Sequence, residues 1–251
     1  MLRTEPFLLG LSLTILLALN GSSGERHLGT AHHLTLWAWE RPERLTFLTP
    51  GDTSVAFLAG TIDLNSQPTP KPRFQPLLVS DGTPLTAVVR LETTASTPIF
   101  LTEEYRRIVV SQILHAADVP RVSGLQIDFD ATASQRDFYG DLLRQVRLLM
   151  PPKMPLSITA LGSWCMGDDW ISRLPIDDAV PMLFRMGRDR ERIMEALRGG
   201  RDFSEPLCRS SLGLSTDEPW PVSLLGKRIY VFSPHAWSET SFAAVQHRLE
   251  P

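Results

Sequence analysis

Eight short apolar runs, rich in β-branched residues, recur along the chain from residue 34 onward. We expect each run to form a strand, at residues 34–39, 55–62, 85–89, 124–128, 156–159, 179–183, 211–214 and 228–232. Helical patterns fit at residues 103–117, 135–149 and 190–197, and a last one at 239–249. Strands that alternate with helices favour βαβ units and a parallel sheet. The predicted fold is therefore α/β, a (β/α)₈ TIM barrel formed as a single domain by residues 30–251.

Two segments fit this barrel less well. Residues 65–76 contain Pro68, Pro70, Pro72 and Pro76, and proline is excluded from helix interiors. We expect a loop there, so the second crossover would lack a helix. The segment between the seventh and eighth strands is also short. An open, doubly wound parallel sheet is the alternative architecture.

Composition and the N-terminus bear on the compartment. The net charge is −3, with 43% hydrophobic and 21% charged residues, which is typical of a globular protein and offers no basic stripe for nucleic acid. In residues 1–24, Arg3 precedes an apolar run from Phe7 to Leu19, and small residues follow it. This pattern indicates a signal peptide, although Glu5 leaves a retained N-terminal anchor open. We expect an exported monomer, periplasmic or secreted, with no other membrane contact.

The two cysteines, Cys165 and Cys208, are too few for the ligand spacing of a zinc site. Cys165 follows the fifth strand and Cys208 precedes the seventh, which predicts opposite ends of the barrel. A strand of five or six residues rises about 17–20 Å, whereas a disulfide requires Cα atoms within about 7 Å. We therefore expect two free thiols, although an oxidising compartment would allow a disulfide.

The fourth predicted strand carries the most informative polar residues. Gln126, Asp128 and Asp130 alternate with Leu125, Ile127 and Phe129, so they share one face. We expect all three to point into the barrel, with Asp130 nearest the open end. Buried carboxylates cost several kcal/mol unless they are paired or used. The C-terminal end of this strand is therefore a candidate site.

Other strand ends supply acids and aromatic residues, and barrel enzymes place their chemistry at these ends. The candidates are Trp37, Trp39 and Glu40 at the end of the first strand, Trp164 after the fifth, Arg185 at the end of the sixth, Asp217 and Glu218 after the seventh, and His235 and Trp237 after the eighth. Carboxylates for acid–base work and tryptophans for stacking on sugar rings are typical of a carbohydrate cleft.

Each candidate also has a structural interpretation. Asp128 and Asp130 could form a buried cluster neutralised by Arg90 or Arg185, and Arg185 is the expected counter-charge. Asp217 and Glu218 precede Pro219 and could form a polar turn. One of Trp37 and Trp39 is expected in the core. Glu40 could simply begin a helix, and His235 could be a loop residue without a catalytic role.

The run Ser123-Gly-Leu-Gln-Ile-Asp-Phe-Asp130 resembles the fourth-strand signature of family 18 glycoside hydrolases, Asp-Gly-x-Asp-x-Asp-x-Glu. In this resemblance Gly124 matches the glycine, and Asp128 matches the inward-facing aspartate. Two positions depart from the signature. Gln126 replaces an aspartate, and Asp130 replaces the glutamate that donates the proton.

A second resemblance covers most of the chain after the N-terminal segment. It rests on the runs that begin at Leu36, Gly124, Ile158, Val180 and Gly213: LWAWERPE, GLQIDFDA, ITALGSWC, VPMLFRMG and GLSTDEP. These runs resemble the bacterial DUF3142 family. The resemblance implies a barrel related to glycosidases and leaves the reaction unassigned.

Two functions follow, with a carbohydrate as the expected partner and no cofactor. The first is a glycosidase-type hydrolase with Asp130 as general acid, Asp128 tuning its pKa, and Asp217 or Glu218 as second carboxylate. Gln126, Trp39, Glu40, Trp164, Arg185, His235 and Trp237 would bind substrate. The second is a non-catalytic carbohydrate-binding barrel, which accounts for the missing glutamate. A metal-dependent hydrolase using Asp128 and Asp130 is a weaker alternative, and no metal is expected.

Overall fold

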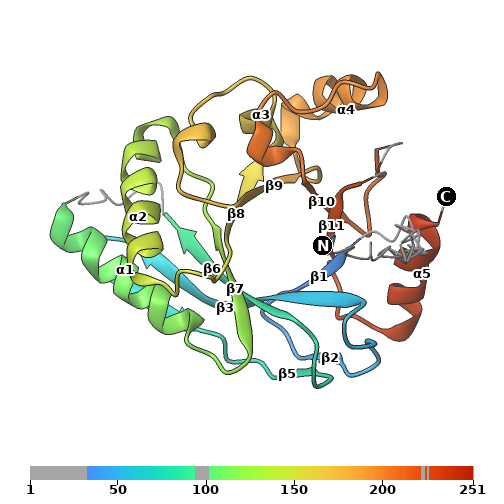
Figure 1. The fold of residues 1–251 in the computed structure, drawn as a ribbon, viewed down its shortest axis with the longest axis horizontal. Helices are drawn as coiled ribbons and strands as arrows, with labels where there is room; N and C mark the ends of the chain where they lie inside the picture. The colour runs from blue at the N-terminus through green and yellow to red at the C-terminus, as the bar shows by residue number, and fades with distance from the viewer. Residues whose placement is uncertain (1–32, 94–101, 222–223, 225, 251) are drawn as a thin grey trace, which may run out of the picture.

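Eight parallel strands close into a barrel in the computed structural model, which describes residues 33–93, 102–221, 224 and 226–250 (Figure 1). In chain order they are β1 (Leu34–Ala38), β3 (Thr53–Leu64), β6 (Leu85–Glu92), β7 (Val122–Asp128), β8 (Leu156–Leu161), β9 (Asp178–Met182), β10 (Ser211–Ser215) and β11 (Arg228–Phe232). Strand β1 pairs with both β3 and β11, which closes the sheet. The predicted TIM-like barrel is confirmed. The expected signal at residues 1–24 lies outside the described residues.

Helices cover most of the outer surface of the barrel, and the four predicted helices are confirmed. They are α1 (Glu103–Ala117), α2 (Arg136–Leu149, preceded by the 3₁₀ turn η1, Ala133–Gln135), α4 (Arg190–Arg198) and α5 (Glu239–Leu249). Shorter turns are α3 (Gly162–Cys165), η2 (Ile171–Arg173), η3 (Gly187–Asp189) and η4 (Pro206–Cys208). Within the described ranges no helix is long and apolar enough to cross a bilayer.

One side of the barrel is covered by strands instead of helices (Figure 1). Here β2 (Glu43–Leu45) and β5 (Leu77–Val79) form a two-stranded parallel sheet, and β4 (Pro68–Pro72) pairs antiparallel with β3. The expected loop at residues 65–76 is therefore wrong for its middle part. Pro68, Pro70 and Pro72 lie at every second position of β4. Their backbone nitrogens, which carry no hydrogen, therefore all face away from β3, as an edge strand permits. β3 extends beyond the end of β1, and β4 covers the edge that this leaves.

A single side chain ties this helix-free side to the mouth of the barrel. The guanidinium of Arg73, just after β4, donates hydrogen bonds to five carbonyl oxygens, those of Ala38, Trp39, Arg41, Leu58 and Gln75. Buried backbone carbonyls are costly when they lack a donor. Arg73 therefore supplies donors that helix or sheet amides provide elsewhere in the fold.

The barrel separates two hydrophobic cores. The larger one lies between the strands and the outer elements, and contains the inward faces of α1 and α2. The smaller one lies inside the barrel around Trp37, Ala56, Val88 and Val180. The indole of Trp37 needs a gap on the facing strand. A Cβ on Gly213 would come within 2.9 Å of it, so glycine there makes room for the ring.

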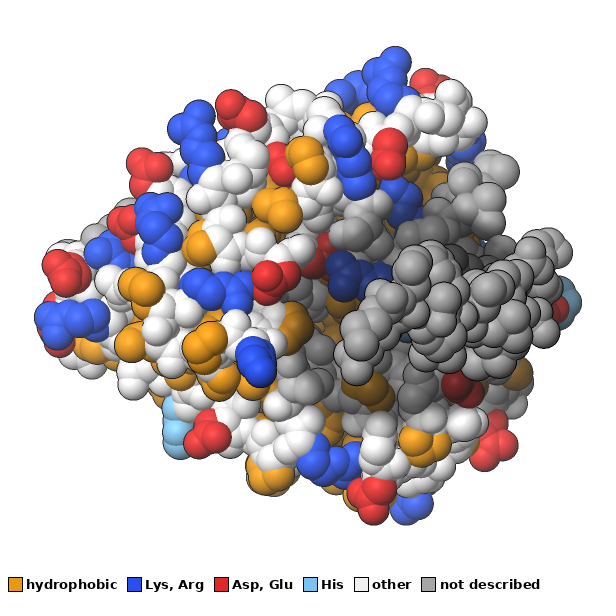
Figure 2. Space-filling model, in the orientation of Figure 1, with side chains coloured by type: hydrophobic (Ala, Val, Ile, Leu, Met, Phe, Trp, Pro, Cys, Tyr) orange, Lys and Arg blue, Asp and Glu red, His pale blue; other side chains and the backbone are white. Residues whose placement is uncertain are grey.

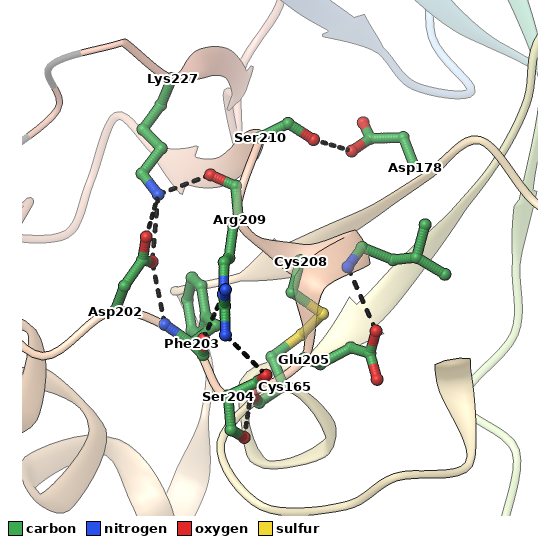
Figure 3. The surroundings of a disulfide bond; sticks show 11 residues. Cys165, Asp178, Asp202, Phe203, Ser204, Glu205, Cys208, Arg209, Ser210 and Lys227 are labelled. Carbon is green, nitrogen blue, oxygen red and sulfur yellow. Dashed lines mark hydrogen bonds and ion pairs between the residues drawn. A yellow bond between two sulfur atoms is a disulfide. The ribbon is translucent and has the colours of Figure 1, made fainter.

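The predicted pair of free thiols is wrong, because Cys165 and Cys208 form a disulfide with Cα atoms 5.8 Å apart (Figure 3). The prediction placed the two residues a full strand length apart. In the barrel, however, Leu161 at the end of β8 is level with Met182, and Met182 is level with Gly213 in the middle of β10. This stagger, which barrel closure requires, brings the end of β8 close to the level at which β10 begins.

The segment around the disulfide is also tied by hydrogen bonds (Figure 3). Ser204 Oγ and the Glu205 amide donate to the Cys165 carbonyl oxygen. Lys227 binds the carboxylate of Asp202 at 2.9 Å. The chain before β10 is therefore fixed against the turn that follows β8.

Candidate functional site

A cavity of about 400 Å³ opens at the C-terminal ends of the barrel strands. Its lining is contributed by β1, β6, β7, β8, β9 and β11 and by the segments that follow the strand ends. The lining residues are Trp37, Trp39, Arg90, Asp128, Asp130, Thr159, Leu161, Gly162, Ser163, Met182, Phe184, Arg185, Met186, Asp189, Ile193 and Phe232. This is the end of a barrel where catalytic groups are found.

The three polar residues on and after β7 occupy different depths. Gln126 is fully buried below the cavity, where its Oε1 accepts from Trp37 Nε1 at 2.8 Å and its Nε2 donates to Ser157 Oγ at 3.2 Å. It does not line the cavity, so the structure gives it no contact with a ligand. Asp128 lines the cavity and is 7% exposed. Asp130 is exposed at the rim, as the alternation predicted.

Asp128 has an unusual electrostatic environment. Burial raises the pKa of its carboxyl, and the nearby charges of Asp130 and Glu92 raise it further. A hydrogen bond from Thr159 Oγ1 at 2.6 Å and the charge of Arg90 oppose this rise. Arg90 Nη1 lies 3.6 Å from Asp128 Oδ2. The prediction that Arg185 is the counter-charge is therefore wrong. Arg90 takes this place because it is level with Asp128 on the neighbouring strand.

This raised pKa predicts how stability depends on pH. Between the pKa of an unfolded aspartate, about 3.9, and the raised pKa of folded Asp128, the native state binds more protons. The free energy of unfolding should therefore fall as the pH rises through that window. Asp128→Asn should remove this decline, because asparagine stays neutral and its Oδ1 can still accept from Thr159. Urea denaturation between pH 4 and 7 measures the effect. Asp52→Asn, an exposed loop substitution, controls for net charge, and parallel profiles for the wild type and Asp128→Asn would contradict the prediction.

The acids after β10 do not line the cavity. Asp217 accepts from Ser215 Oγ, and Arg185 lies 3.7 Å from its carboxylate. Glu218 accepts from the Arg185 amide at 2.8 Å and pairs with Arg190. The structure therefore makes Glu218 a support for the loop that carries Arg185, and gives neither acid the place expected of a second carboxylate.

Aromatic rings form one wall of the cavity. Phe184 and Phe232 stack with centroids 5.6 Å apart, and Trp39 meets Phe232 edge-on at 6.1 Å. Trp37 lies in the inner core, as expected for one of the pair. Trp164 and Trp237 do not supply the expected platforms, because they are only 4% and 5% exposed and pack in the outer core. Sequence reasoning places tryptophans at strand ends but does not show which side of the chain each indole takes.

Glu40 and His235 have structural surroundings. Glu40 Oε1 accepts from the amides of Phe74 and Gln75 at 3.1 and 3.0 Å. It lines a shallow neighbouring hollow with Trp39 and Arg90. His235 is exposed, its amide donates to Ser233 Oγ, and its side chain does not line the cavity. Neither residue lies beside the two β7 carboxylates in the main cavity.

Several residues that line the cavity were not among the site residues predicted from the sequence. Thr159 and Phe232 end predicted strands, so strand parity could have identified them. Asp189 lies in η3 and pairs with Arg192 at 3.1 Å, and no sequence signal distinguished it. A second hollow beside the cavity is lined by Asp63, Lys71, Arg90, Leu91, Glu92, Thr93, Asp128, Phe129 and Asp130. In the ranges that the structure covers, no three His, Cys, Asp or Glu side chains are placed to hold a metal ion.

Charges on the surface are mixed. On the face shown in Figure 2, lysine and arginine side chains alternate with acidic ones, and apolar side chains form small separate areas.

Several solved structures are similar to this chain, and the first of those described here shares its fold. A Streptomyces coelicolor protein assigned as Chitinase A has a TM-score of 0.52 and 10% sequence identity, over 88% of this chain and 96% of that one. The Bacillus cereus spore cortex-lytic enzyme SleL has a TM-score of 0.48 and 13% identity, over 88% of this chain and 58% of that one. The chitinase domain of the Clostridium difficile spore coat protein CotE has a TM-score of 0.42 and 15% identity, over 64% and 52%.

No curated protein matches the sequence. Residues 81–203 match the family model described as a domain of unknown function, DUF3142. This segment runs from the turn before β6 to the chain after α4, and it contains Asp128, Asp130, Arg185 and Asp189. The resemblance to the DUF3142 family is therefore confirmed over the central part of the chain.

Proposed function

We propose that this protein is a glycoside hydrolase that acts on an N-acetylated glycan. One observation carries the proposal: Asp128, a buried carboxyl with a raised pKa, lies below the exposed Asp130 in an aromatic-walled cavity at the barrel mouth. Pairs of titratable groups in contrasting environments are what acid–base catalysis requires. The chitinase-like fold supports the same class of protein.

The positions of the two carboxyls suggest their roles. Asp130 is exposed at the cavity rim and forms no ion pair with any residue in the described ranges, so its carboxyl is accessible to a glycosidic oxygen of a bound substrate. Asp128 lies deeper and is held by Thr159. In this proposal Asp130 is the general acid, and Asp128 supports the charge that develops on the substrate.

The chemistry needs no second carboxylate on the opposite face of the sugar. Asp128 and Asp130 are two residues apart, so their Cα atoms are separated by at most about 7 Å along one wall. Asp189, the remaining carboxylate among the residues that line the cavity, is paired with Arg192. A substrate that supplies its own acetamido group as nucleophile needs only the one-sided pair. This favours N-acetylated sugars, of which chitin is the first to test.

The competing function is a carbohydrate-binding barrel without turnover. It is favoured by Asp130, because aspartate is about one methylene shorter than the glutamate in the family 18 fourth-strand signature that this segment resembles. Misplacement of a catalytic group by about 1 Å can cost roughly 10²-fold in rate. Export remains part of either proposal, and the disulfide supports it, because disulfides persist in oxidising compartments.

Glycan binding and turnover test the proposal together. The wild type should bind N-acetylglucosamine oligomers by calorimetry and release shorter products from them. Trp39→Ala should weaken binding about tenfold, because a half-buried ring of the aromatic wall is lost. Phe74→Ala is the matched control, since Phe74 is 89% exposed and lines none of the hollows described above. Binding without products would establish the non-catalytic alternative, and failure to bind any glycan on a broad array would contradict both.

A further inference from the structure

The backbone around Arg185 is held in an unfavourable conformation. Arg185 has a φ of 52°, in the left-handed region that non-glycine residues rarely adopt. Glu218 fixes it there, since one carboxylate oxygen accepts the Arg185 amide and the other pairs with Arg190. Strained residues persist only where the surroundings hold them, and they cluster at functional sites. The fold therefore specifies the direction in which this side chain leaves the backbone.

The guanidinium of Arg185 is placed against the cavity but is not saturated. It lies over the ring of Phe232 at 5.1 Å, and Phe232 stacks on Phe184. Its only carboxylate neighbour within 4.0 Å among the described residues is Asp217, at 3.7 Å, beyond hydrogen-bond distance. A guanidinium carries five N–H donors in a fixed fork that matches a carboxylate. In the described part of the chain, those of Arg185 make no hydrogen bond.

Both sides of the cavity carry charges of both signs, but two of these charges are matched by an ion pair. Arg90 on β6 pairs with Glu92 and Asp128, and Asp189 after β9 pairs with Arg192. Asp128 and Asp130 belong to β7 and the segment after it, whereas Arg185 follows β9, with β8 between them in the sheet. A ligand carboxylate would be repelled from the β7 side and attracted to Arg185. Such a ligand would therefore be bound in one orientation, with its charged substituent directed away from the proton donor.

We propose that the cavity takes an acidic glycan, and that Arg185 recognises a sugar carboxylate while the ring packs on the aromatic wall. This inference rests on the proposed function, because it specifies the substrate of that same site. It adds a preference for a charged substituent, which neutral chitin oligomers lack although they carry the N-acetylated sugar of the proposed function. Arg185 contributes specificity, and the bond-breaking chemistry remains with Asp130.

A matched pair of ligands isolates the carboxylate. The probes are a hyaluronan tetrasaccharide, which alternates N-acetylglucosamine with glucuronic acid, and its methyl ester, which has the same backbone without the charge. The wild type should bind the acid at least about tenfold more tightly than the ester, the range expected for a charge-assisted hydrogen bond. The preference should decrease as salt is added. Calorimetry gives both dissociation constants.

Three variants assign the effect. Arg185→Gln should bind acid and ester equally, whereas Arg185→Lys should keep part of the preference because it keeps the charge. Arg188→Gln is the matched control, since Arg188 is exposed on the same loop and does not line the cavity. It should retain the full preference. Thermal melting establishes that each variant is folded.

The outcomes separate this inference from the proposed function. Equal binding of acid and ester by the wild type, with N-acetylglucosamine oligomers bound, overturns the acidic-glycan inference and leaves the glycoside hydrolase proposal standing. A preference that survives Arg185→Gln overturns the assignment of Arg185. If no glycan of either charge binds, the proposed function itself is wrong.

Discussion

Asp130→Asn should abolish glycan turnover, with a fall in kcat of at least about 10²-fold, while binding and folding are retained. General acids contribute typically about 10²–10⁴-fold to rate, and asparagine has the same shape without the proton. Asp130 is exposed and forms no ion pair with any described residue. Its replacement should therefore change the free energy of unfolding by no more than about 0.5 kcal/mol. Product release from labelled N-acetylglucosamine oligomers and thermal melting measure the two effects.

Asp189→Asn is the control for charge in the same cavity. Asp189 also lines the cavity, but its carboxylate is paired with Arg192. Removing it changes the local charge equally and should reduce turnover far less. A folded Asp130→Asn variant that still releases products would remove Asp130 from the mechanism.

Removal of the disulfide should have the largest effect on stability. Cys165 and Cys208 are 43 residues apart in sequence, and the chain-entropy model assigns about 4 kcal/mol to a loop of that length. The double variant Cys165→Ala/Cys208→Ala should therefore unfold at a much lower urea concentration than the oxidised wild type. Both side chains are fully buried, so alanine avoids an unpaired hydroxyl.

Reduction provides an independent check on the same bond. A thiol reductant should lower the stability of the wild type towards that of the double variant, and should leave the double variant unchanged. Equal stability of the wild type with and without reductant would contradict the assigned contribution. The effect should extend to the cavity, because α3, which ends at Cys165, begins with two lining residues, Gly162 and Ser163.

The barrel could be predicted from the sequence because its signals are local. Each strand is an apolar run, and the helices α1, α2, α4 and α5 show their own periodicity, so both appear within a few residues of their predicted bounds. Strand β4 was missed because proline was taken as evidence for a loop, and the free edge of β3 that accommodates it is a tertiary feature. The disulfide was missed for a similar reason, since the stagger of β8, β9 and β10 depends on barrel closure.

The site could be predicted only where the alternation of residues along a strand determines the side to which each side chain points. Alternation along β7 places Gln126 and Asp128 inside the barrel, and it carries Asp130 to the rim. Beyond the strand ends there is no such rule. Trp164 lies in the short helix after β8 and is buried in the outer core. The carboxylate of Glu218 accepts a hydrogen bond from the Arg185 amide and so does not reach the cavity. Loop residues depend on contacts between segments far apart in sequence, which a local pattern does not contain.

The hydrogen bonds of Arg73 have a consequence for how the barrel rim can diverge among related proteins. A helix distributes its backbone hydrogen bonds over many amides, so most of its side chains can change without loss of the fold. On the strand-covered side, one guanidinium serves five carbonyl groups from β1, β3 and the segments after β1 and β4. Evolutionary variation should therefore be tolerated along most of this rim but excluded at Arg73. No other amino acid offers five donors in one plane.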